Sequence, residues 1–270
     1  MTRIIVHAGF HKTGTTSLQD FIKANSRALA PYLTAYGKSD FRGAGAHARR
    51  YGQAPFALRR LAFRRSFARF LAALPSDGGT VLLSRETFAG CMPGHRDWRG
   101  RVVQRYSDTG PRLLGEVVRG LRRRFGPQAR IDVLLTTRPF EPWLASVYGH
   151  LLRSIHLQED LSAFRAQLPR CQPLADEAAV FARSLAPLGV EVHIADLADC
   201  ADDPAGPAKA VLDLLDLPTD LRATLAPARR ANRRQTPEIE EQFIAINRQN
   251  LTKSQKKSLK DALLASATAP

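Results

Sequence analysis

Residues 9–17 form a glycine-containing loop whose backbone and side chains could hold an anion. The loop follows the apolar run Ile4-Ile5-Val6 and precedes a helical segment, so its N–H groups would lie at a helix N-terminus. Gly9 and Gly14 permit close approach of a ligand, and Lys12 adds a positive charge. These features predict a phosphate-binding loop. Its expected ligand-binding residues are Gly9, Lys12, Thr13, Gly14, Thr15, Thr16 and Ser17.

The glycine spacing differs from that of an ATP-binding loop. In the pattern G-x-x-x-x-G-K-[ST], matching Lys12-Thr13 to the last pair requires glycine at positions 6 and 11. The chain has Val6 and His11 there, and its loop has the pattern G-x-x-K-T-G-T-T instead. Because of this mismatch, a P-loop kinase or NTPase that uses ATP and Mg²⁺ is only an alternative interpretation. In that interpretation Glu86 would act through the metal.

The segment "GFHKTGTTSLQ" resembles the 5′-phosphosulfate loop, P-K-[ST]-G-T-T, of sulfotransferases that use 3′-phosphoadenosine-5′-phosphosulfate (PAPS). It is closest to their bacterial and heparan-type branches, although His11 stands where many members have proline. The family holds the nucleotide 3′-phosphate with an arginine at a strand end and a serine eight residues later. "TTRPFEPWLAS" supplies Arg138 and Ser146 at that spacing. The resemblance implies PAPS as cofactor, adenosine 3′,5′-bisphosphate as product, and no metal.

Sulfuryl transfer from PAPS resembles phosphoryl transfer, in which catalysis is mainly positioning and charge stabilisation. The resemblance assigns Lys12 to the departing 5′-phosphate. The acceptor hydroxyl or amine also needs a base. Glu86 ends the apolar run "TVLLSRE", and "LLSRETF" resembles the S-S-E-x-F runs of bacterial members, with Arg85 in place of a small residue.

Two histidines are further candidates for the base. His11 lies in the loop itself, and His47 lies in the segment "GAGAHARRYG", which is expected to be a loop. The basic helix expected over Pro55–Leu74 could face an acidic acceptor or could be a solvated surface. In the tail, Arg233 and Arg234 are further candidates for cofactor contact. We expect a sulfotransferase acting on a carbohydrate or glycolipid, which includes acidic glycans.

Short apolar runs alternate with helical patterns along the chain, which is typical of a parallel sheet covered on both faces. We expect one three-layer α/β/α domain of the P-loop NTPase-like class over residues 1–270, with 236–270 as a helical C-terminal extension. The expected strands are Arg3–His7, Thr80–Glu86, Ile131–Arg138 and Val190–Leu197. The expected helices are Thr15–Leu29, Pro55–Leu74, Pro111–Phe125, Glu141–Ser154, 174–186, 206–216 and Pro237–Ala265, with 31–53 and 89–110 irregular.

Lys and Arg number 40 against 25 Asp and Glu, a net charge of +15 that favours polyanionic partners. A nucleic-acid- or anionic-surface-binding protein is thus a second alternative. The absence of a helix-turn-helix, zinc or RNA-binding signature argues against nucleic acid. Three cysteines without metal-ligand spacing are expected to be reduced thiols, and no apolar run approaches a membrane span. We therefore expect a cytoplasmic protein; its acceptor and oligomeric state are not specified by the sequence.

Overall fold

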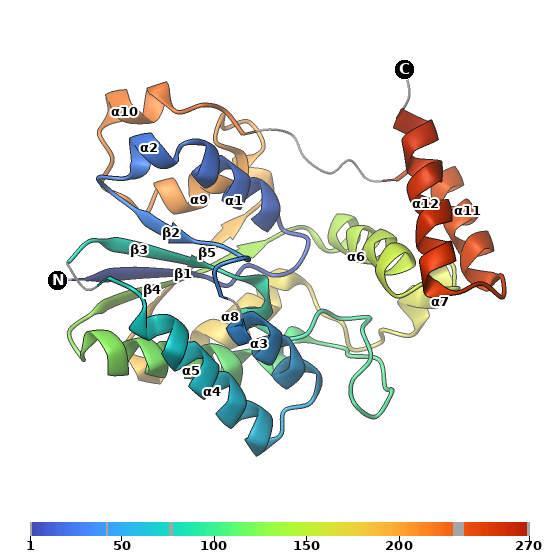
Figure 1. Cartoon of the computed structure of the whole chain (residues 1–270), viewed down its shortest axis with the longest axis horizontal. Helices are drawn as coiled ribbons and strands as arrows, with labels where there is room; N and C mark the ends of the chain where they lie inside the picture. The colour runs from blue at the N-terminus through green and yellow to red at the C-terminus, as the bar shows by residue number, and fades with distance from the viewer. Residues whose placement is uncertain (1, 42, 76–77, 229–234, 269–270) are drawn as a thin grey trace.

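Parallel strands form one sheet in the order β2-β3-β1-β4-β5 (Figure 1). The computed structural model describes residues 2–41, 43–75, 78–228 and 235–268. Within them the strands are β1 Arg3–His7, β2 Thr34–Tyr36, β3 Thr80–Ser84, β4 Arg130–Thr137 and β5 Glu191–Asp196. Val6 of β1 pairs with Leu83 on one side and Val133 on the other. Because every pair is parallel, the carboxyl ends of all the strands meet at one edge.

Alternation along the strands divides the core between the two faces of the sheet. Ile4 and Val6 pack on one face with the buried phenylalanines of α4, whereas Ile5 packs on the other with Leu18 of α1. The first face is covered by α3 Gly43–Gln53, α4 Ala57–Ala72, α5 Gly110–Phe125 and α8 Leu174–Leu185 (Figure 1). The second is covered by α1 Thr15–Ala24, α2 Ser26–Leu29, α9 Lys209–Leu212 and α10 Thr219–Thr224. The expected three-layer α/β class is confirmed.

The remaining helices lie beyond the carboxyl edge of the sheet, to the right in Figure 1. They are α6 Phe140–Ser154, α7 Leu161–Ala166, α11 Pro237–Arg248 and α12 Lys253–Thr268. Lys260 of α12 is buried and donates to Leu152 O at the end of α6. This bond joins the helical tail to the helix that carries Ser146.

Short 3-10 helices occupy several of the connections: η1 Glu86–Ala89, η2 Tyr106–Asp108, η3 Ala186–Leu188, η4 Ala198–Cys200 and η5 Gly206–Ala208. In the described part of the chain, no helix is both long and apolar enough to cross a membrane. The cysteines Cys91, Cys171 and Cys200 are free thiols, as expected.

Several expectations about local structure are wrong. The helix expected over Pro237–Ala265 is divided, because α11 ends at Arg248 and α12 begins at Lys253, and the helix expected over 206–216 is a 3-10 turn followed by α9, which ends at Leu212. Residues 31–53, expected to be irregular, contain strand β2 and helix α3. The helix expected over Thr15–Leu29 is divided at Asn25, whose side chain donates to Ala226 O and accepts from Ala226 N. These tertiary hydrogen bonds hold Asn25 outside the helical path and attach it to a distant segment.

Candidate functional site

The loop between β1 and α1 has an unusual backbone at two positions. Lys12 has φ of +70° and Gly14 has φ of +88°, both in the left-handed region that side-chain-bearing residues rarely adopt. A Cβ at Gly9 would overlap the side chains of Thr136 and His7. Left-handed residues next to a helix N-terminus form a concave set of N–H groups suited to an anion. Residues other than glycine with such a strained backbone, as at Lys12, are also common at functional sites.

Hydrogen bonds to the sheet fix the shape of this loop. The Thr13 hydroxyl donates to Phe10 O at 2.6 Å, and its Oγ1 lies 2.6 Å from Thr136 Oγ1 of β4. Thr13 is fully buried, so its hydroxyl supports the loop from below. Gly9 is buried in the same way. The structure therefore gives Gly9 and Thr13 supporting positions beneath the loop, and a contact of Thr13 with a ligand stays a prediction.

His11 attaches the loop to two aromatic side chains. Its backbone N–H donates to Tyr106 Oη at 3.1 Å, its Nδ1 lies 3.2 Å from the same oxygen, and its carbonyl accepts from Trp143 Nε1 at 3.0 Å. Burial lowers the pKa of His11 to about 3, and neighbouring positive charges act in the same direction. The imidazole is therefore neutral at physiological pH, and its observed contacts orient the loop.

A pocket of about 640 Å³ opens over this loop at the carboxyl edge of the sheet. Its volume is within the range typical of nucleotide- and cofactor-sized ligands. Eight of the residues singled out from the sequence line it, together with a segment that follows β5. Those eight are Lys12, Gly14, Thr15, Thr16, Ser17, Glu86, Arg138 and Ser146. His11 and His47 are not among its described lining residues.

Lys12 and Glu86 influence each other across this pocket. Burial lowers the pKa of Lys12; the Glu86 carboxylate opposes that shift, and Arg153 and Arg138 add to it. Burial likewise raises the pKa of Glu86 above its ordinary value, despite the opposing charges of Lys38, Arg85 and Lys12. The carboxylate is thus a stronger base than a solvated glutamate, and it lies beside the lysine of the loop.

Thr15 provides a buried hydroxyl that makes no hydrogen bond of good geometry within the described residues. The Glu86 carboxyl is near enough for a weak interaction with this hydroxyl, which lowers the pKa of Glu86. An unsatisfied buried hydroxyl costs free energy unless a ligand completes it. Its place in the first turn of α1, on the pocket wall, makes a bound anion the natural partner.

Arg138 and Ser146 lie on the same pocket, as the sequence predicts. Arg138 directly follows β4, and Ser146 lies in the second turn of α6, which begins at Phe140. Two hydrogen bonds already described hold these elements against the loop: Thr13 to Thr136 and Trp143 to His11. The distance between the Lys12 side and the Arg138 side of the pocket is therefore fixed by the fold.

The opposite wall of the pocket was not found from the sequence. It consists of Leu197, Cys200, Ala201, Asp202, Asp203, Pro204, Gly206, Pro207, Pro227 and Ala228. Leu197 N donates to Thr137 O at 3.0 Å, which places this segment next to Arg138. A Cβ on Gly14 would lie 2.7 Å from Pro207 Cγ, so the wall packs directly on the loop. Its one signal was topological: it follows the strand next to β4, at the edge where such sheets bind ligands.

The other sequence candidates lie elsewhere. His47 is in helix α3, where a flexible loop was expected, and it lines a separate pocket with Asp40, Ser66 and Arg69. The position of His47 therefore does not support a role as the base for an acceptor bound at the Lys12 pocket. Arg233 and Arg234 lie outside the described residues.

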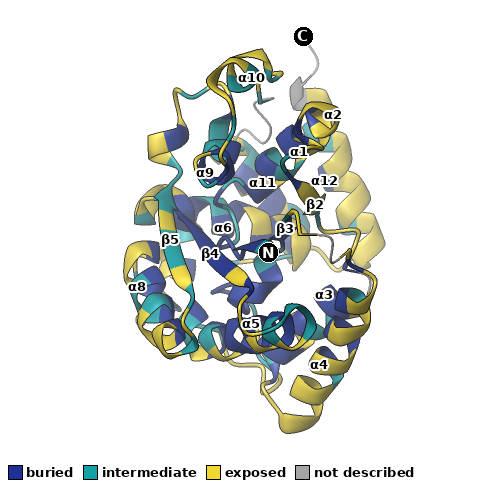
Figure 2. Cartoon of the chain, turned by 90° about the vertical axis from the view of Figure 1, so that its left-hand side faces the viewer, coloured by how far each residue is buried: buried dark blue, intermediate teal, exposed yellow. Residues whose placement is uncertain are grey.

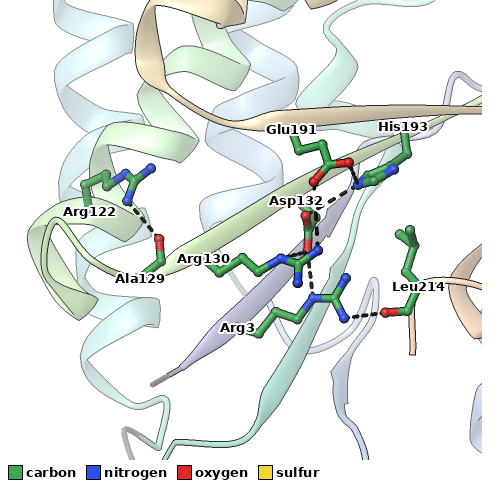
Figure 3. A network of polar contacts seen from close by, with 8 residues as sticks. All are labelled: Arg3, Arg122, Ala129, Arg130, Asp132, Glu191, His193 and Leu214. Atoms are coloured by element: carbon green, nitrogen blue, oxygen red, sulfur yellow. Dashed lines mark hydrogen bonds and ion pairs between the residues drawn. The ribbon is translucent and has the colours of Figure 1, made fainter. Parts of the chain in front are cut away.

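A second charged cluster lies near the edge where the strands begin (Figure 3). Asp132 of β4 is fully buried; its Oδ2 accepts from Arg3 Nε at 2.7 Å and lies 3.4 Å from Arg130 Nε. His193 Nε2 lies 3.4 Å from Asp132 Oδ1 and 3.7 Å from Glu191 Oε1. Asp132, Glu191 and His193 are close enough to resemble a metal-binding group. Guanidinium groups already neutralise the central carboxylate, so the cluster acts as an ion-pair network joining three strands.

Comparison with known proteins does not assign a family. No family model matches the chain, and no curated protein matches it. Among solved structures, it is similar to a chain from the PezAT chromosomal toxin-antitoxin system of Streptococcus pneumoniae. The sequence identity is 10% and the TM-score 0.38, over 96% of this chain and 87% of that chain. A TM-score this low supports no statement about activity.

Proposed function

We propose that this protein is a sulfotransferase that moves a sulfuryl group from PAPS to a hydroxyl or amine of a carbohydrate or glycolipid acceptor. The observation that carries the proposal is the shared pocket of Lys12 and Arg138. Two cationic groups on separate elements, held at a fixed separation, suit a nucleotide with phosphates at both ends. Free thiols and a resemblance to bacterial members also support a cytoplasmic setting.

The nucleotide would lie between the two half-sites. Lys12, the unsatisfied Thr15 hydroxyl and the N-terminal N–H groups of α1 would hold the 5′-phosphate. Arg138 and Ser146 would hold the 3′-phosphate, where a guanidinium can make two hydrogen bonds to one phosphate group. The apolar side chains of Leu197 and Pro227 on the opposite wall provide a surface for the purine ring.

In the transfer step, the acceptor oxygen or nitrogen attacks sulfur while the bond from sulfur to the 5′-phosphate oxygen breaks. The Glu86 carboxylate takes the acceptor proton, since its raised pKa favours proton uptake. Lys12 stabilises the charge that develops on the departing phosphate. The products are a sulfated acceptor and adenosine 3′,5′-bisphosphate, so atoms and charges balance without a further reactant.

The surroundings of Glu86 favour an acidic acceptor. Lys38 and Arg85 both lower the pKa of Glu86 through their charge, and Arg153 acts similarly on Lys12. The Arg85 guanidinium donates to Lys38 O at 2.9 Å, so these two cationic residues are held together beside the proposed base. A carboxylate- or sulfate-bearing glycan would match this charge.

A thermal-shift titration tests the nucleotide assignment. Adenosine 3′,5′-bisphosphate at about 100 times its dissociation constant should stabilise the wild-type protein by about 2.7 kcal/mol. Lys12→Ala and Arg138→Ala should each need much more ligand for the same shift. ATP with Mg²⁺ is the competing ligand in a parallel series.

No shift with millimolar bisphosphate would remove the main support for the proposal. A shift with ATP and Mg²⁺ alone would favour the kinase or NTPase alternative. Once the nucleotide binds, transfer of labelled sulfate from PAPS to an acidic polysaccharide tests the acceptor class, and Glu86→Gln should slow it about 100-fold or more.

A further inference from the structure

The N-terminal end of α4 extends beyond the core and carries exposed apolar side chains. Residues 57–61 are all exposed, and full burial in this helix begins only at Phe63. The exposed fraction is 80% for Leu58 and 39% for Leu61. Figure 2 shows this end of α4 as an exposed projection at the bottom of the molecule.

A neighbouring loop adds two aromatic rings to this end. Trp98 is 49% exposed and Phe56 43%, and their ring centroids are 4.7 Å apart. Trp98 N donates to Gln53 O at 3.2 Å, which holds the loop beside the start of α4. We call Phe56, Leu58, Leu61 and Trp98 the apolar tip. These four account for most of the large hydrophobic side chains that are exposed in the described chain.

Positive charge surrounds the apolar tip. Residues 41–75 contain eight arginines and no aspartate or glutamate. Arg59, Arg60 and Arg65 are exposed on α4, and the Arg99 guanidinium lies 4.5 Å from the Trp98 ring centroid. Asp97, next to Trp98, is paired with Arg101 at 2.9 Å and accepts two backbone N–H groups. Further along α4, Arg64 is paired with Glu116 at 3.5 Å. Around the tip, the described part of the chain therefore carries an excess of guanidinium groups.

We propose that the apolar tip binds the surface of an anionic lipid bilayer. Leucine, phenylalanine and tryptophan would enter the boundary between headgroups and acyl chains, while the flanking arginines contact lipid phosphates. Membrane binding of this type combines apolar area with electrostatic attraction, and the tip supplies both. This inference concerns a surface outside the nucleotide pocket and does not depend on the proposed sulfotransferase activity.

Other occupants fit the tip less well. Leu58, the most exposed of the four, offers neither a stacking surface nor a hydrogen bond to nucleic acid. A second copy of this chain docking tip to tip would bring two arginine clusters together, which like-charge repulsion opposes. A bilayer that contains acidic lipids satisfies the apolar and the cationic groups at once.

Vesicle flotation combined with tryptophan fluorescence tests this proposal. The chain has two tryptophans, and Trp143 is fully buried, so a change in emission on binding reports Trp98. Vesicles of phosphatidylcholine with phosphatidylglycerol should bind the protein and shift the emission to shorter wavelength. Vesicles of phosphatidylcholine alone should bind much less. High salt should weaken the binding.

Paired variants separate the two contributions. Leu58→Asn with Leu61→Asn should weaken binding about tenfold or more, and Arg59→Glu with Arg60→Glu should do the same. Leu259→Asn, on an exposed residue of α12, should bind as wild type does. The proposal would be overturned if the variant with both leucine substitutions bound acidic vesicles as well as wild type does. It would also be overturned if those vesicles left the Trp98 emission of the wild-type protein unchanged. Two further outcomes would contradict it. One is that the protein binds an RNA oligonucleotide in preference to acidic vesicles. The other is that the protein forms a dimer that the double leucine variant abolishes and does not bind lipid.

Discussion

The two edges of the sheet carry charged clusters that differ in how their charges are neutralised. At the edge where the strands begin, Asp132 is surrounded by Arg3, Arg130 and His193 (Figure 3). Burial by itself raises the pKa of Asp132, but the hydrogen bond and charge of Arg3, with those other partners, hold it below its ordinary value. The fold thus favours the charged form of this carboxyl group.

At the edge where the strands end, the balance is reversed. Burial moves the pKa values of Lys12 and Glu86 in the directions that disfavour their charged forms. Thr15 Oγ1 also lacks a hydrogen bond of normal distance and angle within the described chain. Clusters of this second kind occur at functional sites, where a ligand completes what the protein leaves unsatisfied. The comparison teaches that the completed ion pairs support the fold, whereas the incompletely paired charges are the ones that line the candidate site.

Asp132→Asn should produce the largest loss of stability, because it removes the buried carboxylate that pairs with half-buried Arg3. We expect the free energy of unfolding at pH 7 to fall by about 3 kcal/mol, measured by urea denaturation. Glu141→Gln is the matched control: the Glu141–Arg165 pair is exposed, and its loss should cost less than about 1 kcal/mol. Equal effects of the two substitutions would remove the structural role assigned to the Asp132 network.

The same variant should change the pH dependence of stability. Since the pKa of Asp132 is lower in the folded protein, its contribution is fully present above its unfolded value of about 4 and is lost as pH falls through the folded value. The wild type and Asp132→Asn should therefore become more alike in stability in acid. A difference that stays constant with pH would contradict this explanation.

Lys12→Ala should reduce the affinity for adenosine 3′,5′-bisphosphate about 100-fold, which corresponds to about 2.7 kcal/mol. Its stability without ligand should not fall, because the substitution removes a charge that burial and Arg138 already disfavour. Lys23→Ala, on an exposed residue of helix α1 after the loop, is the control and should bind as wild type does. Isothermal calorimetry and urea denaturation measure the two quantities. A large loss of stability in Lys12→Ala would contradict this account, because it would show that Lys12 supports the fold as the Asp132 network does.

Gly14→Ala should affect both stability and binding. Its φ of +88° strains any side chain, and the new Cβ would lie 2.7 Å from Pro207 Cγ. We expect a loss of about 1–2 kcal/mol in unfolding free energy, with weaker nucleotide binding. Gly79→Ala, where the added Cβ would meet no atom of the described chain within 4 Å, is the control. Equal behaviour of the two variants would contradict the described packing of loop and wall.

Glu86→Gln should have the smallest effect on the free energy of unfolding, and at pH 8 it should raise this free energy where the preceding stability variants lower it. Because the pKa of Glu86 is raised in the folded protein, its stabilising contribution is present below about pH 4 and is lost as pH rises through the folded value. At pH 8 the variant should thus be more stable than wild type, by less than about 1 kcal/mol, and below pH 4 the two should match. Lower stability of the variant at pH 8 would show that the fold favours the charged carboxylate.

Much of the framework could be predicted from the sequence, because its signals are local. Apolar runs identified β1, β3, β4 and β5, and the loop and the Arg138–Ser146 spacing pointed to one edge of the sheet. Strand β2 was missed because it has three residues and an exposed face. Helix α3 contains three glycines and was expected to be irregular; it is helical where Ala44 and Ala48 pack into the core.

The missed half of the pocket has a different cause. The wall from Leu197 to Pro207 acquires its position from Thr137 and Gly14, residues far away in the sequence. The support given by Tyr106 and Trp143 to His11 is equally non-local. A motif shows which residues could bind a ligand, whereas tertiary contacts decide which of them reach it.

The most direct test measures the binding of adenosine 3′,5′-bisphosphate and adenosine 5′-monophosphate to wild type, Lys12→Ala and Arg138→Ala by calorimetry. If Arg138 holds the 3′-phosphate, Arg138→Ala should weaken bisphosphate binding about tenfold or more and leave monophosphate binding unchanged. Lys12→Ala should weaken both ligands. Equal weakening of both ligands by Arg138→Ala, or no weakening of either, would contradict a single pocket that holds the two ends of one nucleotide.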